Sequence, residues 1–303
     1  MFDLIGKRNI FFVFSGIILT VAVVFIIIFG FNPAIDLTGG TEWHIGFKPF
    51  TASSALVAPE EIIKSVLSDS TRSIEASVKS VSDGSFIIRL PAIDEKNHQS
   101  FVATLKGLGE FEEKSFSSIG PTIGSELRRK SIWAIILVLV GISLYIAWAF
   151  RKVSQPVKSW KYGVVTLLTL VHDVCIPAGL LALLGELKGI EIDTNFIVAL
   201  LVVMGFSVHD TIVVFDRIRE NLLLRRGRST LAEIINFSVN ETFVRSINTS
   251  LTLIFVLLAL LLVGPASLFY FVLTILVGTV FGTYSSIFVA SPLLFLWSRK
   301  RCT

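Results

Sequence analysis

The chain has 303 residues, of which 53% are hydrophobic and 17% charged, and its net charge is +4. Because soluble globular proteins are about 25% charged, this composition excludes an ordinary soluble domain and indicates an integral membrane protein. Cys175 lies in an apolar segment and Cys302 near the C-terminus, so the two cysteines do not support a disulfide framework.

Six apolar segments are long enough to cross a bilayer. They cover residues 10–30, 131–150, 162–184, 194–216, 243–264 and 268–297. The first is long for the core of a signal peptide, and no clear A-x-A cleavage site follows it. We therefore expect it to remain in the protein as a membrane helix.

Basic residues predict the orientation of these spans. The connections 151–161 and 217–242 and the C-terminal residues 299–301 are rich in Lys and Arg, whereas the connections 185–193 and 264–267 hold one Lys between them. The positive-inside rule then places both termini in the cytoplasm. Residues 128–130, which are basic and lie on the predicted outer side, disagree. The flank of a large translocated domain is a weak test of the rule, so the assignment stands.

The long segment between the first two spans, residues 31–130, is polar and of mixed charge. Its pattern predicts a strand at 41–47, a helix at 59–70, strands at 73–82 and 85–91 joined by an Asp83-Gly84 turn, a helix at 94–109 and a strand at 110–120. This βαββαβ order is that of a ferredoxin-like α+β domain.

The predicted fold class is therefore an α-helical polytopic membrane protein with six transmembrane helices and one extracytoplasmic α+β domain. We expect residues 1–30 to form the cytoplasmic N-terminus and first helix, and residues 31–130 to form the outer domain. Residues 131–303 would form the remaining five helices and the cytoplasmic C-terminus.

Asp210 lies in the fourth apolar segment, where a charged side chain at a helix centre costs about 2.5–3.5 kcal/mol on insertion scales. At a rise of about 1.5 Å per residue it lies roughly 24 Å inward from Thr194, at a depth comparable to Arg245 near the start of the antiparallel fifth span. An Asp210–Arg245 pair is therefore plausible. Arg245 could instead extend to lipid headgroups or pair only with Glu241.

Other polar residues accompany these two inside the predicted spans. Asn248, Thr249 and Thr252 follow Arg245 on one helical face. His172 and Asp173 lie near the middle of the third span, where Pro177 should free backbone groups close to the acid. Asp210 could be a permanently ionised structural partner of Arg245, and Asp173 a hydrogen-bonding residue of the bundle.

Some chemistries are disfavoured by the sequence. His172 and His209 lack a third ligand at metal spacing, so we expect no metal site. Neither a phosphate-binding glycine loop nor a Ser-His-Asp or Cys-His set is apparent, which argues against an enzyme and against a cofactor. The row of Gly278, Gly282 and Ser286 in the last span is more typical of close helix packing.

The sharper hypothesis is a proton site. Burial of a carboxyl group favours its protonated form, and a nearby guanidinium favours its ionised form. An acid that approaches and leaves an arginine would bind and release a proton in alternation. One proton crossing 100 mV supplies about 2.3 kcal/mol, enough to shift a conformational equilibrium of a few kcal/mol. We expect Asp210, assisted by Asp173, to couple this proton to movement of the outer domain.

The sequence resembles a known family in three places: IDLTGGT at 35–41, LVHDVCIPAG at 170–179 and FSVHDTIVVFDRIREN at 206–221 followed by RRG. These segments are similar to the SecF subunit of the bacterial SecD–SecF protein-export complex, of the resistance-nodulation-division superfamily. The likeness covers the whole chain. His209 stands where the family often has Asn, and Ala34 where it often has Gly.

The resemblance implies an accessory of the SecY–SecE–SecG channel in the bacterial cytoplasmic membrane, driven by the proton-motive force. It would work with SecD and SecA to pull preproteins outward late in translocation, with no nucleic acid involved. In the family, the residues that match Asp210 and Arg245 take part in proton conduction, and the role of the one that matches Asp173 is less clear. The alternatives are a small-molecule or lipid exporter of the same superfamily and a scaffold that transduces no energy.

Overall fold

The computed structural model describes residues 3–49, 58–69, 76–81, 84–151, 157–225 and 229–299. Asp83 of the predicted turn, Arg226 and Arg228 of a basic connection, and Cys302 lie outside these residues. The chain divides into two compact units. One combines Met1–Asn32 with Trp133–Thr303, and the other is Pro33–Ile132.

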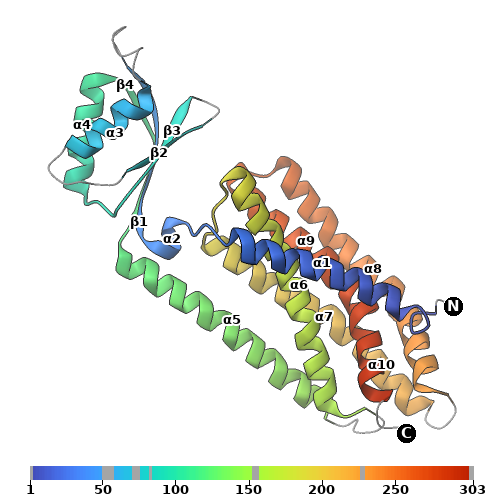
Figure 1. The fold of residues 1–303 in the computed structure, drawn as a ribbon. Helices are drawn as coiled ribbons and strands as arrows, with labels where there is room; N and C mark the ends of the chain where they lie inside the picture. Colours follow the sequence, from blue (N-terminus) through green and yellow to red (C-terminus); the bar gives the residue numbers. More distant parts are fainter. Residues whose placement is uncertain are drawn as a thin grey trace. The chain divides into compact units, whose positions relative to one another are not determined.

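Six helical stretches of the described residues are long and apolar enough to cross a membrane, which agrees with the predicted number. Five are single helices: α1 (Arg8–Phe29), α5 (Pro121–Ala149), α6 (Ser159–Lys188), α7 (Thr194–Leu224) and α8 (Leu231–Val263). The sixth, Ala266–Ser298, runs through a 3₁₀ turn at Ala266–Leu268, α9 (Phe269–Ser285), a π-helical segment at Ser286–Ala290 and into α10 (Ser291–Arg299). Figure 1 shows α1, α6, α7, α8 and α9 side by side.

The predicted basic connection at 217–242 is largely helical instead, because α7 continues to Leu224 and α8 already begins at Leu231. Thr230 starts α8 with a capping box, in which its side chain and that of Glu233 satisfy backbone N–H groups reciprocally. The two extensions are joined by Arg217, whose guanidinium donates to both carboxylate oxygens of Glu241 at 2.7 and 2.8 Å. These side-chain pairs stabilise the parts of α7 and α8 that extend beyond the apolar segments.

Small residues set how closely the helices of the bundle approach. A Cβ atom on Gly179 of α6 would lie 2.6 Å from the backbone of Ala22 on α1. On α9, a Cβ atom on Gly278 would overlap the side chain of Val203 on α7. The glycines therefore act in packing, as expected for a small-residue row. The helix α6 continues through Pro177 without interruption, although the missing N–H leaves the carbonyl of Asp173 without its usual helical donor.

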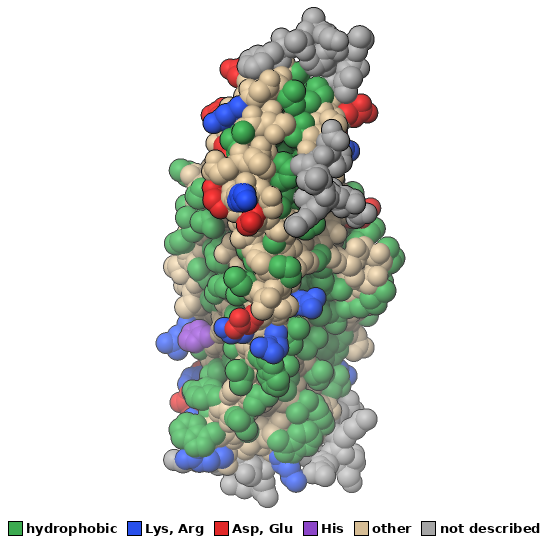
Figure 2. All heavy atoms as spheres, turned by 90° about the vertical axis from the view of Figure 1, so that its left-hand side faces the viewer, with side chains coloured by type: hydrophobic (Ala, Val, Ile, Leu, Met, Phe, Trp, Pro, Cys, Tyr) green, Lys and Arg blue, Asp and Glu red, His purple; other side chains and the backbone are tan. Residues whose placement is uncertain are grey.

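The outer surfaces of several helices are apolar. On α5, exposed side chains include Ile132, Trp133, Ile136, Leu137, Val140, Leu144 and Trp148, and α1 exposes a similar row. Hydrophobic side chains cover much of the helical unit on the face that Figure 2 presents. A soluble protein rarely exposes so much apolar surface, so these faces suit lipid or neighbouring helices.

The unit Pro33–Ile132 contains one four-stranded antiparallel sheet. After the short helix α2 (Ile35–Thr38), its elements run β1 (Gly40–Pro49), α3 (Pro59–Asp69), β2 (Ser77–Ser80), β3 (Ser85–Leu90), α4 (Glu95–Leu108) and β4 (Gly109–Ile119). The elements β1 to β4, with α3 and α4, follow the predicted order along the chain. The strands lie in the order β2-β3-β1-β4.

One face of this sheet holds the core of the unit. Trp43, Ile45 and Phe47 alternate along β1 because successive strand residues point to opposite faces. They pack with Ile63 and Leu67 of α3 and with Phe101 and Leu105 of α4. The sequence did not predict α2, which covers the IDLT of the IDLTGGT motif. Gly39 then turns the chain with φ 78° against Pro121, and a side chain there would be strained.

Candidate functional site

The centre of the helical unit contains two buried carboxyl groups on neighbouring helices. Asp173 lies near the middle of α6 and is fully buried, and Asp210 lies near the middle of α7 and is 3% exposed. The last span packs against both helices, and Gly278 and Gly282 of α9 bring its backbone close to α7. Two acids predicted separately from the sequence thus share one polar region.

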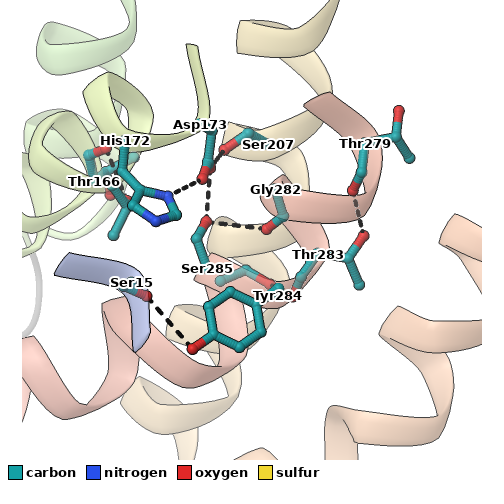
Figure 3. A network of polar contacts seen from close by, with 12 residues as sticks. Ser15, Thr166, His172, Asp173, Ser207, Thr279, Gly282, Thr283, Tyr284 and Ser285 are labelled. Atoms are coloured by element: carbon teal, nitrogen blue, oxygen red, sulfur yellow. Dashed lines mark hydrogen bonds and ion pairs between the residues drawn. The ribbon is translucent and has the colours of Figure 1, made fainter. Parts of the chain in front are cut away.

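Asp173 is surrounded by hydrogen-bond partners from three helices (Figure 3). Nδ1 of His172 lies 2.8 Å from its Oδ1 atom. The hydroxyl groups of Ser207 on α7 and Ser285 on α9 donate to its Oδ2 atom at 2.5 and 2.6 Å. His172 is itself buried, and its Nε2 atom has no hydrogen-bond partner in the described part of the chain.

Asp210 has a similar environment with different donors. The hydroxyl group of Ser286, the first residue of the π-helical segment, donates to its Oδ2 atom at 2.5 Å. Ser246 of α8 is buried beside Asp210, and its Oγ atom has no hydrogen-bond partner in the described part of the chain. A serine hydroxyl can donate to a carboxylate and can also accept from a protonated carboxyl group. Both acids therefore keep their partners in either protonation state.

Arg245 does not form the expected pair with Asp210, and this prediction is corrected. Arg245 is exposed on α8, and no acid among the described residues lies within ion-pair distance of its guanidinium group. Successive helix residues point about 100° apart, and the packing of α8 turns the next residue, Ser246, toward Asp210 instead. The spacing along the chain did not predict the direction in which the Arg245 side chain points.

The other supporting residues on α8 lie on the exposed side with Arg245. Asn248, Thr249 and Thr252 are all exposed. Thr249 and Thr252 donate their hydroxyl groups to carbonyl oxygens of α8 itself. The predicted polar stripe therefore exists, but it faces away from the buried acids. His209 on α7 is exposed as well, whereas His172 lies inside.

Glu241 is not available to Arg245 as a partner in this arrangement. It accepts from both Arg217 and Asn221, and Arg217 also donates to Glu220 at 2.6 Å. The sequence analysis did not predict this cluster. It also missed Ser207, Ser285 and Ser286 as donors. The sequence feature that could have indicated these donors is the adjacent pair Ser285-Ser286 in the last apolar span.

No group of three or more His, Cys, Asp or Glu side chains that could hold a metal ion occurs among the described residues. The side chains at the two sites present carboxyl, imidazole and hydroxyl groups. Each site can hold a proton and exchange it with a neighbouring group.

This architecture defines a polytopic membrane protein with titratable groups buried inside its helical bundle. The profile of the family described as "Protein export membrane protein SecD/SecF, C-terminal" matches residues 100–300. The chain is 44% identical to the protein translocase subunit SecF of Thermobaculum terrenum, over 99% of this chain and 95% of that protein. The chain belongs to the SecF family of membrane proteins, and this membership supports a role in protein translocation.

Longer relatives contain the same region as one part. The chain is 36% identical to the protein translocase subunit SecDF of Thermus thermophilus, over 90% of this chain and 35% of that protein. The crystal structure of SecDF from the same organism matches with a TM-score of 0.78 and 33% identity, over 98% of this chain and 39% of that chain. The chain thus spans about two fifths of this solved SecDF chain.

Proposed function

We propose that this chain is a proton-driven subunit of a protein translocase in the bacterial cytoplasmic membrane. In this proposal, proton exchange in the helical bundle moves the unit Pro33–Ile132 on the outer side and promotes a late stage of preprotein translocation. The observation that carries the proposal is the buried pair Asp173 and Asp210, each held by hydroxyl groups, with no Lys or Arg partner among the described residues.

The energetic argument favours a function over a purely structural role. A buried acid is costly to keep in a membrane helix, and hydrophobic residues would pack the same space. Hydroxyl partners that serve both protonation states lower the rearrangement needed when a proton enters or leaves. These features suit a group that changes its charge during a working cycle.

The proposal gives Arg245 a role different from the direct pairing with Asp210 that the sequence indicated. Its exposed face of α8, with Asn248, Thr249 and Thr252, would contact the membrane helices of SecD. The fused SecDF relatives support SecD as a partner, since this chain corresponds to only part of their length. Arg245 would then act on proton exchange from this interface, while Asp210 and Asp173 hold the proton. The SecY–SecE–SecG channel, SecA and the preprotein complete the proposed assembly.

The test compares Asp210→Asn with Asp216→Asn in membrane vesicles that secrete a preprotein. Both changes replace an acid on α7 by its amide, but Asp216 is exposed and pairs with Arg219. We expect Asp210→Asn to abolish the stimulation of secretion by a proton gradient and Asp216→Asn to keep it. Full stimulation with Asp210→Asn would reject the motor and leave a scaffold. Unchanged secretion with loss of drug resistance would favour an exporter.

A further inference from the structure

Ser285 and Ser286 are adjacent residues of one helical stretch, yet they reach acids on two different helices. Ser285 donates to Asp173 on α6 at 2.6 Å, and Ser286 donates to Asp210 on α7 at 2.5 Å. Both serines are fully buried. The two acids therefore have no backbone element in common but share one dipeptide as a hydrogen-bond partner.

Each serine also has a second acceptor on its own helical stretch. The hydroxyl group of Ser285 lies 3.1 Å from the carbonyl oxygen of Gly282, and that of Ser286 lies 2.9 Å from the carbonyl oxygen of Thr283. A hydroxyl group has one proton to donate. Each serine can therefore point its proton at the acid, or at the carbonyl while it accepts from a protonated acid.

The Ser285-Ser286 dipeptide lies where the helix changes from α-helical to π-helical hydrogen bonding. The α-helical hydrogen bonding of α9 ends at Ser285, and the five residues Ser286–Ala290 are π-helical. Pro292 follows as the second residue of α10. Its ring and its missing N–H disturb the preceding turn, which accounts for a π segment at this place. Such segments are often found at functional sites and allow a helix to shift locally.

We propose that Ser285 and Ser286 are positioning residues that couple the proton occupancy of Asp173 to that of Asp210. Because the two serines share one backbone junction, a shift that adapts one hydroxyl group to a change of charge displaces the other. This inference rests on the proposed function and identifies which residues link its two proton sites. Of the two acids, Ser207 donates its hydroxyl group only to Asp173, so it is not part of the link.

The titratable and charged groups around the link are few in the described residues. His172 contacts Asp173 from α6. His209 lies next to Asp210 on α7 and is exposed. Tyr284, beside the serines, has its hydroxyl group 3.4 Å from Ser15 of α1. Arg245 on α8 faces outward. Among the described residues, no buried Lys or Arg pairs with either acid. The two serines are therefore the direct connection between the acids.

The experiment measures infrared carboxyl bands of the full chain in lipid vesicles as the pH is changed. The bands of Asp173 and Asp210 are assigned from Asp173→Asn and Asp210→Asn. With the serines present, we expect Asp210→Asn to move the titration midpoint of Asp173 by about one pH unit or more, the size that marks interacting sites. In Ser285→Ala/Ser286→Ala, Asp210→Asn should leave that midpoint where it is.

Two controls separate coupling from general damage. Thr283→Val removes a buried hydroxyl group of α9 that donates to Ser250 on α8 at 2.6 Å, without touching either acid, and should keep the coupling. Ser285→Thr/Ser286→Thr retains both hydroxyl groups and should restore it. If the double alanine variant does not fold, either single alanine variant must abolish the coupling, since the link needs both ends.

Coupling that persists without the serines would overturn this inference. Because the measurement needs no transport, its outcome is independent of the secretion test. Secretion by Asp210→Asn with a full response to the gradient would reject the motor and leave the measured coupling unaffected. Loss of that response, with uncoupled acids in the wild-type chain, would keep the motor and reject the role of the serines.

Discussion

Asp210 and Arg245 illustrate how the surroundings of single residues decide their chemistry. Asp210 is buried with Ser286 as its donor, whereas Arg245 lies on the exposed side of α8. A guanidinium group is always charged and brings five donors, so an exposed position at an interface suits it better than an apolar bundle. Serine hydroxyl groups fit beside the acid because they are small and can reverse their hydrogen bond.

A second residue with a defined electrostatic environment is Asp3, which precedes α1. The backbone N–H of Gly6 and the side-chain amide of Asn236 donate to its Oδ1 atom at 3.0 and 2.7 Å. These bonds favour the ionised carboxylate and hold the pKa of Asp3 below its usual 3.8. Asn236 in turn accepts from the backbone N–H groups of Leu4 and Ile5, so the N-terminal segment is attached to α8.

The sign of this shift predicts how the attachment depends on pH. A lowered pKa stabilises the folded arrangement above about pH 4, and this contribution is lost as the pH falls through the folded value. We expect hydrogen exchange at the amides of Leu4 and Ile5 to speed up under acid conditions, beyond the intrinsic change with pH. Asp3→Asn should remove this extra pH dependence, and an unchanged dependence in that variant would contradict the assignment.

At the scale of the elements, the contact between α7 and α9 positions the site. Gly278 and Gly282 lie against Val203 and Ser207 of α7, which places the end of α9 next to both acids. The same approach accounts for the buried position of Ser285 and Ser286. Helices that approach closely gain van der Waals contact, which is one of the sources of helix association in lipid.

Gly278→Ala tests this contact, because its Cβ atom would overlap the side chain of Val203. Overpacking of this kind typically costs about 1–3 kcal/mol, so we expect a lower unfolding temperature in detergent. Gly205→Ala on α7 is the matched control, since no atom lies within 4 Å of its added Cβ, and it should leave that temperature unchanged or raise it. Adding Val203→Ala should partly rescue Gly278→Ala; equal effects of the two glycine changes would disprove the close contact.

At the scale of the whole molecule, the chain joins two units that place their hydrophobic residues differently. The helical unit has an internal core around Phe150, Tyr162 and Phe215, and apolar outer surfaces. The unit Pro33–Ile132 has its own core around Trp43, on one face of its sheet. Its edge strand β4 is largely polar on the surface, which protects an open sheet edge from pairing with other chains.

We predict that residues 33–132 fold by themselves in water. The core of Trp43, Ile45 and Ile88 is complete within the unit, and Trp43 is the only tryptophan in that range. Its fluorescence should change in one cooperative step with urea, at the same midpoint as circular dichroism. Ile88→Ala, a deletion in the core, should lower this midpoint and cost about 2–5 kcal/mol. Non-coincident transitions would show that the unit depends on the helices.

The sequence by itself determined the membrane class, the number of candidate spans, the order of strands and helices in residues 31–130, and the presence of two acidic residues within the spans. Hydropathy and periodicity suffice for these features because the length of a segment and the side it buries follow from the order of apolar and polar residues along the chain. Only the tertiary structure decided that Arg245 faces outward, that α7 and α8 extend toward each other, and that Ser285 and Ser286 serve two different acids. The direction in which a helix residue points depends on how the whole helix is rotated against its neighbours, and packing contacts between distant segments set that rotation.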